Sequence, residues 1–318
     1  MRRNLTSIEL CTGAGGQAIG LEQAGFAHHA LVEIDADCCV TQRMNRPRWN
    51  VMQTDIKDFI HSASRYHGID LVAGGLPCPP FSVAGKQLGA DDERNLFPDA
   101  LKIIELTAPK AVMIENVRGF LDPIFASYRE ELRRKLLKLG YIADWRLLNA
   151  SDFGVSQLRP RVVIVALHKD IVAGFSWPTP SLNPPPTVGE LLFDLMSERG
   201  WRGAEEWCAK ASAIAPTIVG GSKKHGGPDL GPTRARNAWA ILGVEGRTIA
   251  ETAPDENFVG LPRLTVRMVA KLQGFPDDWH ISGKKTAAYR QVGNAFPPPV
   301  ARAVANAVAK AIMAERGA

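Results

Sequence analysis

Near its N-terminus the chain reads Ser7-Ile8-Glu9-Leu10-Cys11-Thr12-Gly13-Ala14-Gly15-Gly16, an apolar run that ends in a glycine-rich turn. A helix-like stretch, residues 17–24, follows directly. Glycines here allow a tight turn and bring backbone N–H groups close to a ligand at the helix N-terminus. The spacing from Gly13 to Ala18 fits a dinucleotide fingerprint, and Glu33, about 20 residues further on, can accept hydrogen bonds from ribose hydroxyls. The sequence therefore predicts a nucleotide-binding turn.

The first 170 residues continue this alternation of short apolar runs and amphipathic stretches. Such a rhythm is typical of a parallel sheet covered by helices on both faces. We therefore predict an α/β fold with a doubly wound, mostly parallel sheet. Its predicted strands are 7–11, 29–34, 71–74, 112–115, 143–148 and 162–167, and its predicted helices are 17–24, 38–44, 99–106 and 128–139.

The rhythm breaks at a proline-rich stretch around residues 178–186. Beyond it, the sequence is irregular and rich in Gly, Pro, Lys and Arg until about residue 285, and an alanine-rich, helical tail follows. A long insertion with a return to the first domain is the simplest architecture. We predict one domain from residues 1–176 plus 286–318, and a smaller irregular domain from residues 177–285.

Two reactive side chains follow predicted strands. Cys78 stands between prolines just after the apolar run 69–75, and Glu115 ends the apolar run 111–114. Prolines limit where the thiol can point. Parallel strands that end in a nucleophile and a carboxylate bring both to one edge of the sheet, where α/β enzymes keep their chemistry. Taken alone, Cys78 is better interpreted as a small buried hydrophobe.

Composition excludes several classes of protein. The 318 residues are 45% hydrophobic and 22% charged, as in ordinary globular proteins. No apolar run approaches the roughly 18 residues of a membrane span, so we expect no membrane partner. The five cysteines lack C-x-x-C spacing, which argues against a disulfide framework or a zinc site and indicates a cytoplasmic protein. The net charge of +5 suits a polyanion but does not identify one.

Taken together, the motifs resemble those of the DNA cytosine-5 methyltransferase family, in the family's usual order and through most of the chain. They are the glycine loop at 11–16, Glu33, Asp55, Pro77-Cys78, Glu115-Asn116-Val117, the segment 157–161, the segment 267–276 and Gln291-Val292-Gly293-Asn294. Two positions depart from the family pattern. Cys11 stands where the family usually has phenylalanine, and Phe296 replaces a more common aliphatic residue.

The resemblance implies S-adenosylmethionine as the cofactor, S-adenosylhomocysteine as its product, and no metal. Asp55 would suit the adenine amino group, although a solvated loop aspartate is an equally good interpretation of its position. The cofactor-binding residues that the resemblance implies are Cys11, Thr12, Gly13, Gly15, Gly16, Glu33, Ile34, Asp55, Ile56, Gly75, Pro77, Asn294 and Ala295.

The resemblance also implies a covalent mechanism on a cytosine flipped out of the duplex. Cys78 would attack carbon 6 and thereby make carbon 5 nucleophilic. Glu115 would hydrogen-bond N3 and the exocyclic amine, while Arg161 and Arg159 would direct positive charge at the base O2 and a nearby phosphate. Without the family pattern, a solvated strand edge is the better interpretation of both arginines.

Residues 177–285 would then be the target-recognition domain, and residues 1–176 plus 286–318 the catalytic and cofactor-binding domain. Any single lysine or arginine in the smaller domain is as well explained by phosphate contact or solvation as by base readout. We expect a monomer that binds double-stranded DNA, paired in function but not physically with a restriction endonuclease. The predicted DNA-contacting residues are Ser82, Lys86, Thr217, Ile218, Lys223, Lys224, Arg234 and Arg236.

Our interpretation is a site-specific DNA cytosine-5 methyltransferase that protects host DNA in a bacterial restriction–modification pair. One alternative is an RNA cytosine methyltransferase with the same chemistry, although the insertion is larger than a tRNA-directed relative needs. A nicotinamide oxidoreductase would explain the glycine loop but leaves Cys78, Glu115 and Arg161 without a role. A DNA-binding protein that has lost catalysis is the third alternative.

Overall fold

The computed structural model describes residues 5–77, 95–221 and 227–316. The chain forms two compact units. The sheet unit comprises residues 1–148, 160–179 and 300–318, and the insert unit comprises residues 149–159 and 180–299. Segments 149–159 and 286–299 thus pack with the insert unit, although the sequence analysis placed them in the first domain. That prediction divides the chain by function, and the packing of the units does not test it.

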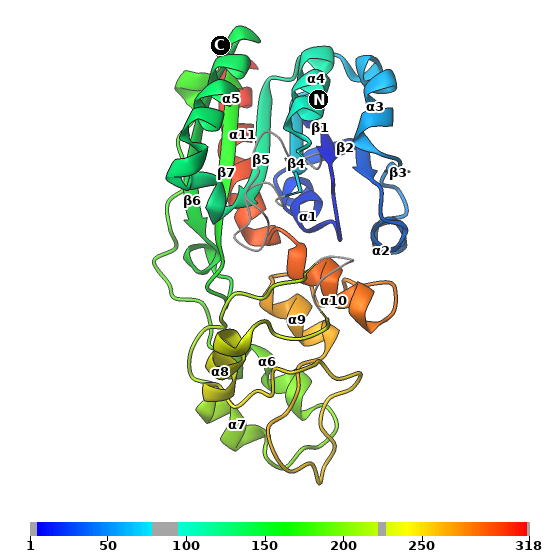
Figure 1. The fold of residues 1–318 in the computed structure, drawn as a ribbon, viewed down its shortest axis with the longest axis vertical. Coiled ribbons are helices and arrows are strands. Elements are labelled where there is room, and N and C mark those ends of the chain that lie inside the picture. The colour runs from blue at the N-terminus through cyan, green and yellow to red at the C-terminus, as the bar shows by residue number, and fades with distance from the viewer. Residues whose placement is uncertain (1–4, 78–94, 222–226, 317–318) are drawn as a thin grey trace. The chain divides into compact units, whose positions relative to one another are not determined.

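The sheet unit is built on a seven-stranded sheet of order β3-β2-β1-β4-β5-β7-β6 (Figure 1). β1 pairs in parallel with β2 and β4, and β4 pairs in parallel with β5, whereas β5 and β7 are antiparallel. The predicted α/β fold with a mostly parallel sheet is confirmed. Its strands are β1 (Leu5–Leu10), β2 (Phe26–Glu33), β3 (Val51–Gln53), β4 (Leu71–Gly75), β5 (Ala111–Val117), β6 (Tyr141–Asn149) and β7 (Pro160–His168).

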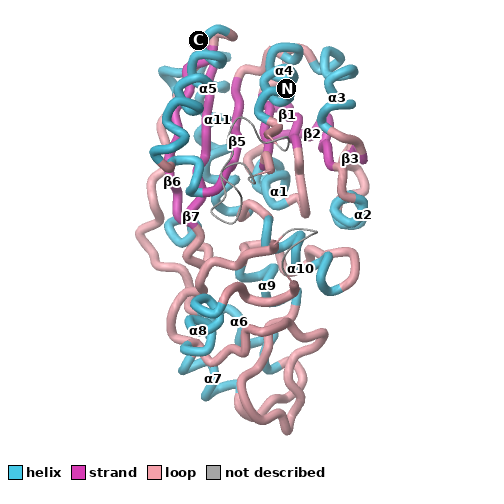
Figure 2. The backbone as a smooth tube through the Cα atoms, in the orientation of Figure 1, coloured by secondary structure: helices cyan, strands magenta, loops and turns pink. Residues whose placement is uncertain are grey.

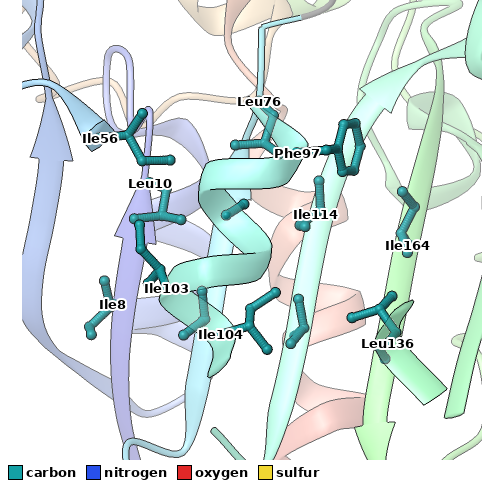
Figure 3. Packing of buried hydrophobic residues seen from close by; sticks show 14 of the residues in the cluster. Ile8, Leu10, Ile56, Leu76, Phe97, Ile103, Ile104, Ile114, Leu136 and Ile164 are labelled. Carbon is teal, nitrogen blue, oxygen red and sulfur yellow. The ribbon is translucent and has the colours of Figure 1, made fainter. Parts of the chain in front are cut away.

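Helices cover both faces of this sheet. The main core contains apolar side chains of α3 (Ile56–Ala63), α4 (Phe97–Thr107) and α5 (Ala126–Lys138) packed on one face. Figure 3 shows Ile103 and Ile104 of α4 among the strand residues Ile8, Leu10 and Ile114. On the other face lie α1 (Gly16–Gln23), α2 (Ala36–Asn45) and, behind the strands in Figures 1 and 2, α11 (Pro298–Arg316).

The sequence analysis did not predict β3 or α3. β3 is only three residues long, too short to show an alternating pattern. α3 begins at Asp55, whose carboxylate accepts a hydrogen bond from the backbone N–H of Lys57 at 2.9 Å. α2 begins in the same way at Asp35, which accepts from the N–H groups of Asp37 and Cys38. An aspartate N-cap thus starts each of the two helices, α2 and α3, that follow β2 and β3.

The insert unit is helical where the sequence suggested only irregular structure. Its helices are short, and proline- and glycine-containing loops separate them, so a hydrophobic period has little length in which to appear. Thr187 starts the first of them with a reciprocal capping box to Glu190. The helices are α6 (Val188–Ser197), α7 (Ala204–Lys210), α8 (Thr233–Ile241), α9 (Val266–Leu272) and α10 (Lys285–Asn294).

The described residues also form short 3₁₀ helices, at Ser64–Tyr66, Arg118–Leu121, Pro123–Phe125, Ala150–Phe153 and Val172–Gly174. Within the described ranges, we find no helix whose length and hydropathy would let it cross a membrane.

Candidate active site

The glycine loop connects β1 to α1 through backbone that turns into the left-handed region. Cys11, Gly13 and Gly15 have φ angles of 55°, 55° and 85°. Glycine adopts this conformation freely, whereas Cys11 does so at a cost of roughly 1 kcal/mol. Gly15 is the N-cap of α1 and offers no side-chain acceptor to the first N–H groups of the helix. The loop therefore presents a helix N-terminus that suits an anionic or polar ligand.

Glu33 fixes this loop from the end of β2. One carboxylate oxygen accepts a hydrogen bond from the N–H of Gly13 at 2.7 Å, and the other accepts from the N–H of Asp35 at 2.8 Å. Burial raises the pKa of Glu33, although these two N–H groups oppose the shift. Ile34 follows directly and is 65% exposed. A fixed carboxylate beside an exposed apolar side chain fits the ribose and the flat purine of an adenosine group.

The ends of β1, β4 and β5 converge beside the loop. A Cβ atom added to Gly75 would lie 3.6 Å from Oε2 of Glu115 and 3.7 Å from the carbonyl oxygen of Cys11. These distances place the Glu115 carboxylate beside the backbone at the end of β4. Pro77 is exposed just beyond it, while the predicted nucleophile, Cys78, lies outside the described residues.

Glu115 and Arg161 form an ion pair across β5 and β7. Nε of Arg161 lies 2.9 Å from Oε1 of Glu115, and both side chains are largely buried. The pair depends on the antiparallel register, in which Val117 faces Arg161 and Glu115 faces Val163. Arg161 also donates to the carbonyl oxygen of Pro160 at 2.8 Å. The interpretation of Arg161 as part of a solvated strand edge is therefore wrong, because its charge is paired inside the protein.

Arg159 does not join this pair. It lies in the insert unit, is fully buried, and donates to the carbonyl oxygens of Ile218, Gly293 and Ala295 at 2.6, 2.9 and 2.9 Å. The interpretation of Arg159 as part of a solvated strand edge is therefore wrong as well. Its donors meet the protein backbone, which favours a structural role over the predicted contact with the base.

The predicted recognition element around Thr217 packs on the C-terminal end of α10. A Cβ atom on Gly293 would lie 2.5 Å from Cα of Gly220, so the two backbones touch. The side-chain amide of Asn294 donates to the carbonyl oxygen of Gly221 at 3.0 Å. The sequence analysis missed this contact between two motifs. A glycine in each motif, Gly220 and Gly293, was the sequence feature that could have indicated a close approach of the two backbones.

The remaining predicted residues divide between the two units. Asp55 caps α3, and Ile56 is buried in the first turn of that helix. Thr12 and Gly16 are buried in the glycine loop. Arg234 is exposed on α8, and Arg236 is partly buried there and donates to Thr233 at 3.2 Å. Ser82, Lys86, Lys223 and Lys224 lie outside the described residues.

A buried glutamine that the sequence analysis missed also touches the loop. Nε2 of Gln42, on α2, donates to Oγ1 of Thr12 at 2.6 Å and to the carbonyl oxygen of Gly13 at 2.8 Å. As for metals, the described part of the chain holds no group of three or more His, Cys, Asp or Glu side chains arranged to bind an ion.

Comparison with known proteins identifies the family. The family model of the C-5 cytosine-specific DNA methylases matches residues 5–310. The chain belongs to this family. The predicted family and enzyme class are thereby confirmed. Members of this family methylate cytosine in DNA, and membership of the family implies use of S-adenosylmethionine.

Two curated relatives are similar over nearly the whole of this methyltransferase. The Type II methyltransferase M.NgoMIV of Neisseria gonorrhoeae is 54% identical over 98% of this chain and 99% of its own. The Type II methyltransferase M.NaeI of Lentzea aerocolonigenes is 52% identical over 98% of this chain and 76% of its own.

Solved structures share the fold at much lower identity. DNMT2 of Spodoptera frugiperda superimposes with a TM-score of 0.65 at 20% identity, over 96% of this chain and 99% of its own. The S. pombe Dnmt2 methyltransferase gives a TM-score of 0.64 at 20% identity, over 98% of this chain and 99% of its own. At these identities the likeness extends to the fold alone.

Proposed function

We propose that this chain is a site-specific type II methyltransferase that modifies carbon 5 of cytosine in double-stranded DNA and protects host DNA from a cognate restriction endonuclease. The observation that carries the proposal is the buried Glu115–Arg161 pair beside Gly75 and the glycine loop, at one edge of the sheet. Two relatives that are more than half identical and are named type II methyltransferases support it. The enzyme acts as a cytoplasmic monomer, and its pairing with the endonuclease is functional.

The glycine loop and the ends of β2 and β4 hold the cofactor. When bound, S-adenosylmethionine supplies an electrophilic methyl group for carbon 5 of the base. Glu33 accepts from the ribose hydroxyls, Ile34 packs on the purine, and the uncapped N-terminus of α1 receives the polar end of the molecule. The other proposed contacts come from Cys11, Thr12, Gly13, Gly15, Gly16, Asp55, Ile56, Gly75, Pro77, Asn294 and Ala295.

Cys78 is the nucleophile toward the base. Its thiolate forms a bond to carbon 6 of a flipped cytosine, and the electron pair of the C5–C6 double bond makes carbon 5 nucleophilic. Once carbon 5 has taken the methyl group, loss of its proton restores the C5–C6 double bond and releases the thiolate. Cys11 is the described thiol nearest to this edge, but burial and the charge of Glu33 raise the pKa of Cys11 and keep it protonated. A protonated thiol is a poor nucleophile.

Glu115 and Arg161 stabilise the base during the attack. The Glu115 carboxylate, fixed by the ion pair, can accept a hydrogen bond from the exocyclic amine, and from N3 when that atom carries a proton. Negative charge develops on the ring as the thiolate adds, and the Arg161 guanidinium, held within 2.9 Å of Glu115, compensates it at O2. Because both side chains are fixed before the base arrives, little reorganisation is needed during the reaction.

The insert supplies sequence recognition: residues 177–285 form the target-recognition domain, and residues 1–176 plus 286–318 form the catalytic domain. Thr217 contacts the target from an element tied to α10, whereas Ile218, also predicted as a DNA contact, is fully buried and packs inside the protein. Lys223, Lys224, Arg234 and Arg236 contact phosphates and base edges, and Ser82 and Lys86 meet the opened duplex.

The test is incubation of the purified chain with S-adenosylmethionine and a mixed DNA library, followed by sequencing of 5-methylcytosine at single-base resolution. Methylation confined to one short motif is expected. Cys78→Ser should abolish it, whereas Cys208→Ser, a matched change on α7, should leave it intact. Methylation of tRNA but not DNA would instead identify the RNA alternative, and activity in Cys78→Ser would refute the covalent mechanism.

A further inference from the structure

Gln42 is an unusual residue for the interior of an α/β protein. It is fully buried on α2, and both hydrogen atoms of its side-chain amide point at the glycine loop. The acceptors are Oγ1 of Thr12 at 2.6 Å and the carbonyl oxygen of Gly13 at 2.8 Å. A carbonyl oxygen can only accept, so this contact fixes which end of the amide faces the loop.

Gln42 and Glu33 together hold both polar groups of Gly13. The N–H of Gly13 donates to the Glu33 carboxylate, and its carbonyl oxygen accepts from Gln42. Gly13 has a φ of 55°, and a Cβ atom there would meet nothing within 4 Å. Steric contact at this position therefore does little to restrain a residue that is free to adopt many conformations. The two hydrogen bonds select one of them.

The amide is kept at an energetic cost. Oε1 of Gln42 has no hydrogen-bond partner among the described residues, and a buried polar atom without a partner is destabilising. A methionine would fill the same length without an unsatisfied oxygen. What the amide adds is the pair of donors that fix Thr12 and Gly13.

We propose that Gln42 is a positioning residue for cofactor binding, which presets the glycine loop so that the N-terminus of α1 is presented before the cofactor arrives. This inference rests on the proposed role of the loop as the cofactor site. A loop that is already ordered loses less conformational entropy when a ligand binds, so the preset loop raises affinity for the cofactor. Gln42 touches the loop and not the reacting atoms, so the rate of the chemical step is unaffected.

The test compares Gln42→Met with Asn45→Leu in the full chain. Asn45 is a matched control because its side-chain amide, on the same helix, donates to the carbonyl oxygen of Thr41, one turn earlier, at 2.7 Å. Calorimetric titration with S-adenosylhomocysteine should show binding about tenfold weaker for Gln42→Met, from the loss of two neutral hydrogen bonds, and within about twofold of wild type for Asn45→Leu. At saturating cofactor, kcat and the affinity for DNA should stay within about twofold of wild type.

Hydrogen exchange of the protein without cofactor gives a second readout. The amides of Gly13 and Gly15, which donate to Glu33 and to the carbonyl oxygen of Thr12, should be protected in the wild type and exchange at least tenfold faster in Gln42→Met. Equal cofactor affinity in wild type and Gln42→Met, or unprotected loop amides in the wild type, would overturn the inference alone. Failure of the wild type to bind S-adenosylhomocysteine would instead refute the proposed cofactor site. If Gln42→Met does not fold, the wild-type exchange measurement still decides.

Discussion

Replacement of Arg159 by methionine should destabilise the protein without removing a catalytic group. The native guanidinium donates to three buried carbonyl oxygens in the insert unit, at 2.6 to 2.9 Å. Each carbonyl left without its donor costs at least about 1 kcal/mol. We use the lower end of the range because methionine also removes the desolvation cost of a buried charge. The expected loss is therefore about 3 kcal/mol in the free energy of unfolding.

Urea unfolding followed by tryptophan fluorescence measures this loss. Arg202→Met is the matched control, since Arg202 pairs with Glu256 at an exposed position of the same unit. Exposed ion pairs contribute at most about 1 kcal/mol, so the control should change stability by less than that. Arg159→Lys keeps the charge but cannot reach three diverging acceptors, and it should fall between wild type and Arg159→Met.

Activity of Arg159→Lys separates a structural role from a catalytic one. If the guanidinium only holds the backbone, folded Arg159→Lys at 25 °C should keep kcat within about tenfold of wild type. A loss of kcat of more than about a hundredfold, with stability unchanged, would show that Arg159 acts on the base and would refute the structural assignment.

Three further predictions follow from other contacts. Glu115→Gln should lower kcat at least about a hundredfold while cofactor affinity is kept, as measured by single-turnover methylation. Burial lowers the pKa of His28 to about 4 in the folded protein. Below pH 6.5, the ordinary pKa of histidine, His28 therefore gains a proton in the unfolded chain while it stays neutral in the folded one. The stability of wild type relative to His28→Gln should therefore fall by up to about 3 kcal/mol between pH 6.5 and pH 4, in urea titrations. Arg316→Ala leaves the buried Asp70 carboxylate without its cation. The free energy of unfolding should therefore fall by about 2 kcal/mol, measured as a lower midpoint of thermal unfolding.

Sequence reasoning located the ends of strands well. Glu33 and Glu115 each end an apolar run, and a polar residue at that place in a parallel sheet belongs to the edge that carries ligands. Both residues lie there in the structure. The same reasoning could not detect β3, because three residues are too few to establish a period.

Arg159 and Arg161 separate at a strand boundary. The resemblance to the family assigned both arginines to the base, and residues two apart on one strand would point to the same face. β7, however, begins at Pro160, and Arg159 belongs to the preceding segment of the insert unit. Arg161 pairs with Glu115 inside the sheet unit, and Arg159 turns into a different core.

The role of Gln42 could not be predicted from the sequence for another reason. A glutamine in an amphipathic helix normally marks the solvated face, and nothing in its neighbours along the chain distinguishes this one. Its role depends on the packing of α2 against a loop some 30 residues earlier, which the contact to Thr12 reveals. Side-chain contacts between distant segments are the part of a site that one sequence alone does not contain.

The attachment of the Thr217 element to α10 also bears on how such enzymes diversify. Arg159 and Asn294 bind main-chain carbonyl oxygens of residues 218 and 221, and main-chain groups survive a change of side chain. Gly220 and Gly293 are tied to their residue type because a Cβ atom on either would collide with backbone, and Gly221 is tied to its type by a positive φ of 68°. A recognition segment grafted from a relative can therefore differ at exposed positions such as Val219 and still dock, provided that these glycines are retained.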